Sequence, residues 1–304
     1  MICIAIWFKY KTIKLKIYNM SIILIFVILF FLNIYLKGIK HKYILLLMKV
    51  TISNKNKKDL FVALFQILKN CTSVVSARFE EDKLHIQGMD KAHICLFNVN
   101  IQKSWFDEYV IEEQTQISFD TNIFHLVIST KQDSHNMTIH FDGDDSINVD
   151  LVAQEHLKGE YDKHFKIPLV DFDYEEMDIP NVEYDAEFSI AAKKICEITS
   201  QMMSFGTDIN VKCSEERIDI ITNGITGEML VNIPIEDLTE YSIIEGEIID
   251  LKYSLNYVNK MCLTNKLSSE VQFCISAQYP MKIIYDLGDD SSLVFFMAPK
   301  ISDD

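Results

Sequence analysis

The stretch "FEEDKLHIQG" (79–88) returns in altered form, 134 residues later, as "CSEERIDIIT" (213–222). Both begin with a turn of acidic residues and continue with a basic residue and apolar residues at alternate positions. Such alternation after a turn predicts a β-strand, and its recurrence at a fixed offset indicates an internal duplication. The matched positions are Lys83 and Arg217, Leu84 and Ile218, and Ile86 and Ile220.

A helical pattern upstream recurs at the same offset. The stretch "KKDLFVALFQILKN" (57–70) matches "AAKKICEITSQMMS" (191–204), and apolar residues coincide with the i, i+3, i+7 spacing of one buried helix face. Two ordinary amphipathic helices followed by ordinary strands would also give this match. The order strand, helix, strand, turn, strand in both halves favours duplication. The coinciding positions are Phe61 and Ile195, Leu64 and Ile198, and Leu68 and Met202.

Most of the remaining sequence predicts antiparallel β structure. Each half also holds a second short helix candidate, at 121–130 and 251–262, so the predicted fold class is α+β, with both helices of a half on one face of a sheet. Between the halves, 165–184 contains two prolines and no helical period, which predicts an extended linker. The predicted strands lie at 50–53, 83–89, 93–100, 137–142, 147–153, 186–191, 208–213, 217–222, 227–233, 268–276, 280–287 and 292–298.

Charge divides the chain into two parts. Residues 1–47 hold seven lysines and no acidic residue, which leaves 22 basic against 44 acidic residues in 48–304. A protein that gripped nucleic acid over its whole surface would be basic, so any contact with a polyanion must be confined to one patch.

The first 47 residues include the apolar run "SIILIFVILFFLNIYL" (21–36), which is short for the roughly 20 residues of a spanning helix. Three interpretations compete: a signal or anchor helix, a disordered leader, or sequence upstream of the true start. We favour the last, with Met48 as the start, and do not expect membrane association. N-terminal sequencing or a mass measurement of the native protein decides between them.

Patterns that would indicate catalysis or metal binding are missing from the sequence. There is no GxGxxG, P-loop, GxSxG or HExxH motif, and the acidic clusters lie at expected turns, where solvated acids are ordinary. The seven cysteines form no CxxC pair, and most lie in apolar runs, which suits buried thiols in a reducing compartment. We therefore expect no enzyme activity, no cofactor and no metal.

Three stretches carry a family resemblance: "QGMDKAHICLFNV" (87–99), "VDFDYEEMDIPNVEY" (170–184) and "FFMAPKISDD" (295–304). They resemble the Ser-Met-Asp-x-x-His-Val stretch, the Leu-Gly-Ile-Pro connector and the closing Ala-Pro-Lys-Ile of proliferating cell nuclear antigen, the sliding clamp of eukaryotes and archaea. The resemblance runs from about Met48 to the end of the chain. It implies a leader (1–47), a first clamp domain (48–165), a connector (166–181) and a second clamp domain (182–304).

The same resemblance implies a function without catalysis. Three subunits of the family close a ring around duplex DNA, helices inward and sheets outside, and tether a polymerase and repair proteins; a separate ATP-driven loader opens the ring. The implied partners are double-stranded DNA, proteins with a short glutamine and aromatic motif, the loader and two further copies, joined through edges near 160–168 and 225–234. The implied location is the nucleus or, for a viral member, a replication site in the cytoplasm.

The family's partner pocket carries over by motif. It receives a short partner helix and an aromatic plug, and an apolar patch rimmed by acids suits that role. Strand residues such as Ile94 and Phe296 could equally be core. Asp178 stands where the family often has glycine, and Met177 replaces a leucine. The implied lining is Met89, His93, Ile94, Leu96, Met177, Ile179, Pro180, Pro280, Phe296, Ala298, Pro299 and Ile301.

The helices that would face DNA depart from the family. Glu197 and Ser200 stand where arginines are common, and Leu263 replaces a lysine. Candidate DNA contacts, which could equally be ordinary solvated lysines, are Lys57, Lys58, Lys69, Lys193, Lys194, Lys260 and Lys266. Two alternatives to a ring therefore stay open: a monomeric or dimeric processivity factor held by charge, and a partner-binding scaffold that has lost DNA binding.

Overall fold

The duplication predicted from the sequence is present in the fold. The computed structural model describes residues 46–155, 158–172 and 174–300. The first copy comprises β1 (Met48–Ile52), α2 (Lys55–Cys71), β2 (Val74–Phe79), β3 (Lys83–Met89), β4 (Cys95–Gln102), the 3-10 turn η1 (Lys103–Trp105), β5 (Glu108–Ile111), β6 (Thr115–Asp120), α3 (Thr121–Ser129), β7 (His135–Phe141), β8 (Ser146–Ala153) and β9 (Lys163–Pro168).

The second copy repeats the first in the same order. It comprises β10 (Ala186–Ala191), α4 (Ala192–Met202), β11 (Asp208–Cys213), β12 (Arg217–Gly224), β13 (Gly227–Pro234), η2 (Ile235–Asp237), β14 (Glu240–Ile243), β15 (Ile249–Ser254), α5 (Leu255–Met261), β16 (Glu270–Ile275), β17 (Met281–Gly288) and β18 (Ser291–Met297). Four of the residues predicted to begin a helix, 251–254, instead complete β15, where Tyr253 is fully buried. The α+β prediction is confirmed.

An antiparallel sheet connects the two copies. Within the described ranges, the strands form a five-stranded sheet (β5-β1-β7-β8-β9), a nine-stranded sheet (β14-β10-β16-β17-β18-β4-β3-β2-β6) and a four-stranded sheet (β13-β12-β11-β15). The nine-stranded sheet crosses from one copy to the other where β18 pairs with β4, with Phe295 opposite Phe97. A side chain on Gly88 would meet the ring of Phe97 at 2.4 Å, so the absence of a Cβ there makes room for this junction.

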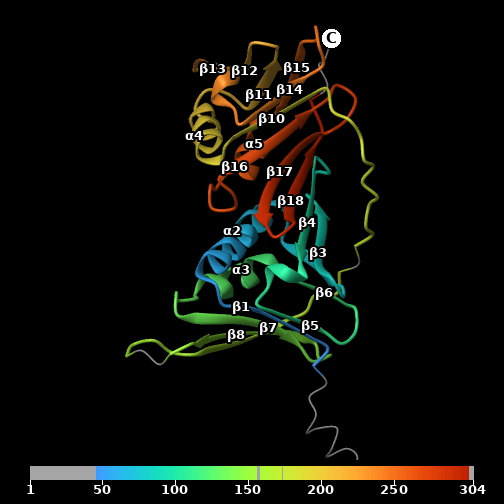
Figure 1. Ribbon diagram of the computed structural model, residues 1–304, viewed down its shortest axis with the longest axis vertical. Helices are drawn as coiled ribbons and strands as arrows, with labels where there is room; N and C mark the ends of the chain where they lie inside the picture. Colours follow the sequence, from blue (N-terminus) through green and yellow to red (C-terminus); the bar gives the residue numbers. More distant parts are fainter. Residues whose placement is uncertain (1–45, 156–157, 173, 301–304) are drawn as a thin grey trace, which may run out of the picture. The chain divides into compact units, whose positions relative to one another are not determined.

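The helices lie on the side of the sheets away from the linker. In Figure 1, α2, α3 and α4 lie on one side and the extended chain between the copies runs along the other. Asn54 caps α2 by accepting from the backbone N–H groups of Asn56 and Lys57, and Asp120 caps α3 in the same way. The buried face of α2 packs Phe65 against Phe124 of α3, with ring centroids 4.5 Å apart.

The chain between the copies is extended, as predicted, although its first residues belong to β9, which continues to Pro168. Among the described residues of 169–185 there is no helix or strand. We call 169–185 the connector. Val170 donates a backbone hydrogen bond to Ser118 of β6 (2.8 Å), and after β18 Lys300 donates one to Lys252 of β15 (2.7 Å). Because β6 and β15 are equivalent, the chain end follows the same path as the start of the connector.

The membrane, metal and cysteine expectations are compared here with the described residues. The apolar run 21–36 lies outside the described residues. In the part of the chain that the structure describes, no helix combines the length and apolar character needed to cross a membrane. Nor do the described residues place three or more His, Cys, Asp or Glu side chains where they could hold a metal ion. Cys95, Cys213, Cys262 and Cys274 are buried free thiols.

Candidate functional site: a surface pocket and a helical face

A pocket opens where the connector meets both copies. It has a volume of about 240 Å³ and is lined by the loop after β3, the connector, the turn after β16 and the end of β18. The structure brings ten of the twelve predicted residues together here: Met89, His93, Ile94, Leu96, Met177, Ile179, Pro180, Pro280, Phe296 and Ala298. Pro299 is not among the lining residues, and Ile301 lies outside the described residues.

Four lining residues were not predicted: Asp178, Val182, Tyr184 and Tyr279. The rings of Tyr184 and Tyr279 meet edge-on with centroids 6.4 Å apart, and burial raises the pKa of Tyr184 to about 12. Tyr279 directly precedes the predicted residue Pro280, and that adjacency was the available signal; Tyr184 stands four residues after Pro180, and no local signal marked it. The apolar wall with one carboxylate at Asp178 suits an apolar peptide segment.

One glutamine holds the connector at the pocket. The side chain of Gln87, which is 5% exposed, accepts the backbone N–H of Met177 (2.8 Å) and donates to the Met177 carbonyl (3.0 Å). The hydroxyl of Tyr174 also donates to the Gln87 carbonyl oxygen (3.0 Å). The Gln87 carboxamide thus hydrogen-bonds the Met177 backbone as a neighbouring strand would. These bonds fix where the Met177 side chain enters the pocket.

An ion cluster fixes the connector one residue earlier. The carboxylate of Glu176 bonds the guanidinium of Arg78 and lies 3.3 Å from Nδ1 of His85. Arg78 also pairs with Glu80 at 2.8 Å, and Nε2 of His85 lies 2.7 Å from the side-chain oxygen of Asn98. Arg78 and His85 come from β2 and β3, so the sheet grips the connector immediately before Met177.

The helical face carries the other predicted site, and here one prediction is wrong. Lys58 is fully buried, and its ammonium donates to the backbone carbonyls of Asp133 (2.8 Å) and His135. Burial lowers its pKa. Its position in the first turn of α2 resembled a solvated helix end, but the ammonium donates to carbonyls of the loop after α3 and of the start of β7 and cannot reach a phosphate.

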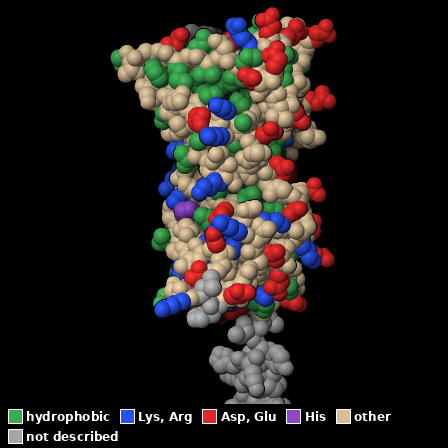
Figure 2. Space-filling view, turned by 60° about the vertical axis from the view of Figure 1, so that its left-hand side comes forward, with side chains coloured by type: hydrophobic (Ala, Val, Ile, Leu, Met, Phe, Trp, Pro, Cys, Tyr) green, Lys and Arg blue, Asp and Glu red, His purple; other side chains and the backbone are tan. Residues whose placement is uncertain are grey.

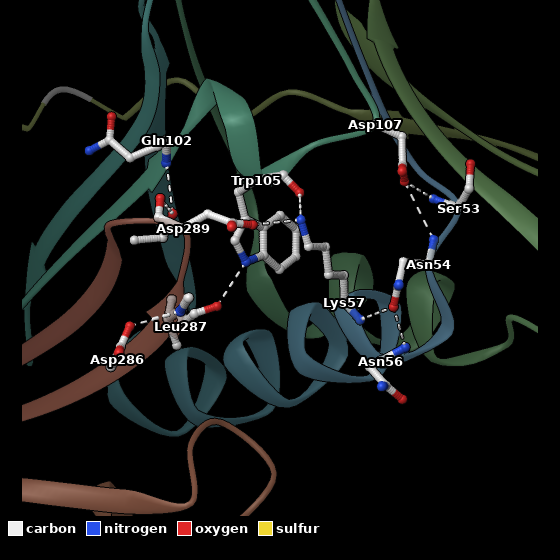
Figure 3. A network of polar contacts seen from close by, with 12 residues as sticks. Ser53, Asn54, Asn56, Lys57, Gln102, Trp105, Asp107, Asp286, Leu287 and Asp289 are labelled. Carbon is white, nitrogen blue, oxygen red and sulfur yellow. Dashed lines mark hydrogen bonds and ion pairs between the residues drawn. The ribbon is translucent and has the colours of Figure 1, made fainter.

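Lys57 is engaged at the junction between the copies. Its ammonium donates to the Trp105 carbonyl (2.7 Å) and to the Asp289 carboxylate (2.7 Å), and it lies 5.3 Å from the centroid of the Trp105 ring (Figure 3). The Trp105 indole N–H donates to the carbonyl of Leu287 (2.9 Å), which belongs to the second copy. These contacts give Lys57 a structural role.

The remaining predicted lysines lie on α2, α4 and α5 or, for Lys266, in the loop after α5. Lys193, Lys194 and Lys266 are exposed, and Lys260 lies 5.5 Å from the centroid of the Tyr257 ring. Figure 2 shows Lys and Arg side chains separated by neutral surface, not joined in one patch. Apolar side chains interrupt this face, among them Ile123 (46% exposed) and Leu126 (61% exposed) of α3. The expected grip on phosphates is therefore weak for each subunit.

Lys69 and Lys58, on the same helix, allow a partly exposed lysine to be compared with a buried one. The Lys69 ammonium lies 3.1 Å from Nδ1 of His125, whose pKa is lowered by burial and by Lys69, so the ring is neutral near pH 7 and Lys69 keeps the positive charge at this position. We expect Lys69→Glu to weaken DNA association several-fold and to flatten its salt dependence, with unfolding unchanged. Lys58→Met should instead lower the free energy of unfolding by about 2 kcal/mol, since it orphans buried carbonyls. Salt titrations of DNA binding and urea unfolding measure these effects; unfolding of Lys69→Glu would show that Lys69 is structural.

The fold and pocket together define a class: duplicated α+β clamp subunits with a connector bordering an apolar surface pocket. Family models of proliferating cell nuclear antigen match residues 53–176 (N-terminal domain) and 178–300 (C-terminal domain). The chain belongs to the proliferating cell nuclear antigen family, whose members are non-catalytic processivity factors.

Relatives from distant organisms cover most of the chain. "Proliferating cell nuclear antigen 2" of Plasmodium falciparum is 23% identical over 80% of this chain and 96% of its own length. The "DNA polymerase sliding clamp" of Methanothermobacter thermautotrophicus is 24% identical over 81% of this chain and 96% of its own length. The crystal structure of the antigen from Thermococcus kodakaraensis matches 83% of this chain and all of its own, with TM-score 0.74 and 18% identity.

Proposed function

We propose that this chain is a DNA sliding clamp, a processivity factor that encircles duplex DNA as a homotrimer and tethers polymerases and repair proteins through the pocket. It has no catalytic role. Geometry would keep it on DNA, so a weakly basic helical face is compatible with function. Tethering raises the local concentration of a bound polymerase at the primer end.

The observation that carries this proposal is the equivalence of two strand edges. β9 and β13 lie at sheet edges, and in the repeat they correspond to β18 and β4, which pair with each other inside the chain. Each subunit thus has two free strand edges, β9 and β13, that are equivalent to the two strands already paired inside the chain, β18 and β4. Identical copies can join head to tail through β9 and β13, and such contacts form a ring when the rotation closes.

The repeat also predicts the register between subunits. In the second copy Phe295 pairs with Ile283, as Phe165 pairs with Val149 in the first, so Phe295 and Phe165 are equivalent. In the first copy Val99 pairs with Ile86, as Val231 pairs with Ile220 in the second, so Val99 and Val231 are equivalent. Transferring the pairing of Phe295 with Phe97 puts Phe165 opposite Met229 of the next subunit. The pairing of Phe296 with Leu96 likewise puts Lys166 opposite Glu228, so opposite charges would face each other across the seam.

This register predicts a charge-swap result. Lys166→Glu places like charges across each seam and should destabilise each strand pair by about 1 kcal/mol. The trimer should then dissociate at higher protein concentration, and Glu228→Lys in the same chain should restore it. Sedimentation across a dilution series measures the mass of residues 48–304. A double variant no more stable than the single variants would mean that the two side chains do not face each other.

Retention on DNA tests the function itself. A loaded ring should stay on closed circular DNA and slide off after the circle is cut, whereas a protein held by charge would leave both at the same rate. The experiment needs an ATP-driven loader of the family type, which we propose as a further partner. Equal escape from circular and linear DNA would overturn encirclement and favour a monomeric or dimeric processivity factor.

One observation favours a second candidate, a partner-binding scaffold without DNA. The helical face has exposed apolar residues, and two of the seven predicted lysines, Lys57 and Lys58, are occupied within the protein. A scaffold would bind the peptide motif but would not remain on circular DNA with a loader. For either role we propose a nuclear location, or a cytoplasmic replication site if the source is viral.

A further inference from the structure

A buried carboxylate shapes the loop that forms one wall of the pocket. Asp90, 7% exposed, follows β3 directly and accepts backbone N–H groups from Ala92 (2.9 Å), Ile94 (2.8 Å) and Cys95 (2.7 Å). Its own backbone N–H donates to the Cys95 carbonyl (2.9 Å), which closes the loop. His93 lies in the left-handed region, with φ of 57°, so the loop has little freedom to adopt another path without these bonds.

A fourth donor to Asp90 comes from the other copy. The hydroxyl of Tyr257, on α5, donates to Oδ2 of Asp90 at 2.7 Å. Burial raises the pKa of Asp90, but the backbone and tyrosine hydrogen bonds outweigh it and lower the pKa below its usual value. Burial and the bond to Asp90 raise the pKa of Tyr257 to about 12, so near pH 7 a protonated phenol faces an ionised carboxylate.

The pocket spans the junction that this bond crosses. His93 and Ile94 come from the loop that Asp90 holds, whereas Pro280, Phe296 and Ala298 come from the second copy. Where this loop ends, β4 pairs with β18, with Cys95 opposite Met297 and Leu96 opposite Phe296, and the Ala298 N–H donates to the Ile94 carbonyl at 3.3 Å. The strand pairing fixes Leu96 beside Phe296, whereas the positions of His93 and Ile94 depend on the loop that Asp90 and the short, charge-assisted bond from Tyr257 hold.

We propose that Tyr257 is a positioning residue for the partner pocket: from the helical side of the molecule, and through Asp90, it sets the position of the loop that carries His93 and Ile94. It touches no partner itself, since it is not among the residues that line the pocket. The inference rests on the proposed peptide-binding function. It also places a determinant of partner affinity on α5, beside the candidate DNA contact Lys260.

The test is Tyr257→Phe, which removes one oxygen atom. Binding of a fluorescent synthetic peptide of the Gln-x-x-aliphatic-x-x-aromatic-aromatic type should weaken about tenfold, the usual size of a lost hydrogen bond to a charged group. Tyr241→Phe is the matched control, because its hydroxyl also donates to one acceptor, the Ser214 carbonyl (2.6 Å), and lies outside the pocket. The control should bind the peptide as the wild type does.

A double-mutant cycle separates positioning from general loss of stability. Asp90→Asn keeps the side chain's shape and replaces the charged acceptor by a neutral one, which weakens the bond. If the two residues act through that bond, Tyr257→Phe should cost less affinity when added to Asp90→Asn than when made alone. Additive losses, or wild-type affinity in Tyr257→Phe, would overturn the proposal. If Tyr257→Phe fails to fold, Asp90→Asn carries the test, and wild-type affinity in it is the contrary result. Failure of the wild-type protein to bind the peptide would instead refute the pocket's function.

Discussion

Phe296→Ala is expected to weaken the binding of a Gln-x-x-aliphatic-x-x-aromatic-aromatic peptide by roughly 30-fold or more. Phe296 lies in β18, but its side chain is only half-buried and faces the pocket. Its ring supplies apolar surface that a partner's aromatic plug would cover, and truncation of a central aromatic in such a site typically costs 2 to 4 kcal/mol. At about 1.4 kcal/mol per tenfold, that loss lowers affinity by roughly 30-fold to almost 1000-fold.

Ile179→Ala should cause a similar loss of peptide affinity from the opposite wall. Ile179 lies in the connector, outside any strand, so its truncation should leave the sheets intact. Val294→Ala is a matched control: it removes apolar atoms from the same strand, yet Val294 does not line the pocket. Fluorescence anisotropy measures all three variants, after thermal melts show that each is folded. Unchanged affinity in both Phe296→Ala and Ile179→Ala would remove the pocket assignment.

The sequence was sufficient for the duplication and most of the pocket because both leave local patterns. An apolar helix stripe repeated at one offset located α2 and α4, and three short motifs supplied residues from the loop after β3, the connector and the chain end. The start of α5 was misplaced, because Leu251 to Ser254 fit a helical period as well as a strand. Pairing with β11, a long-range contact, decides for the strand.

The sequence could not distinguish exposed lysines from engaged or buried ones, because the burial of neighbouring positions on a helix depends on tertiary contacts. Lys57 and Lys58 are adjacent and look alike, yet one crosses the junction and the other is buried beneath a loop 75 residues away. Similarly, nothing local marks Gln87 or Tyr257 as holding the pocket walls; each acts on a residue at least 90 positions distant. Such roles become visible only when the chain is folded and distant residues meet.

Trp105 makes a buried contact between the two copies. It is fully buried, its ring packs 5.3 Å from that of Phe106, and its indole N–H bonds Leu287 of the second copy at 2.9 Å. Trp105→Ala is expected to lower the free energy of unfolding by about 4 kcal/mol, as the cavity left by a large core residue adds to the lost hydrogen bond. Urea unfolding should also become broader if the copies no longer unfold together.

The companion variant Lys57→Met separates packing from charge at this junction. The Lys57–Asp289 pair is partly exposed, with side-chain accessibilities of 29% and 47%, so its loss should cost less than about 1 kcal/mol. A loss below about 2 kcal/mol for Trp105→Ala, or an equal loss for both variants, would contradict the packing argument.

In the repeat, Asp237 of η2 stands where Trp105 stands in η1. The seam between subunits would then lack this anchor, and dilution should separate the proposed trimer into subunits well before the two copies within one chain come apart.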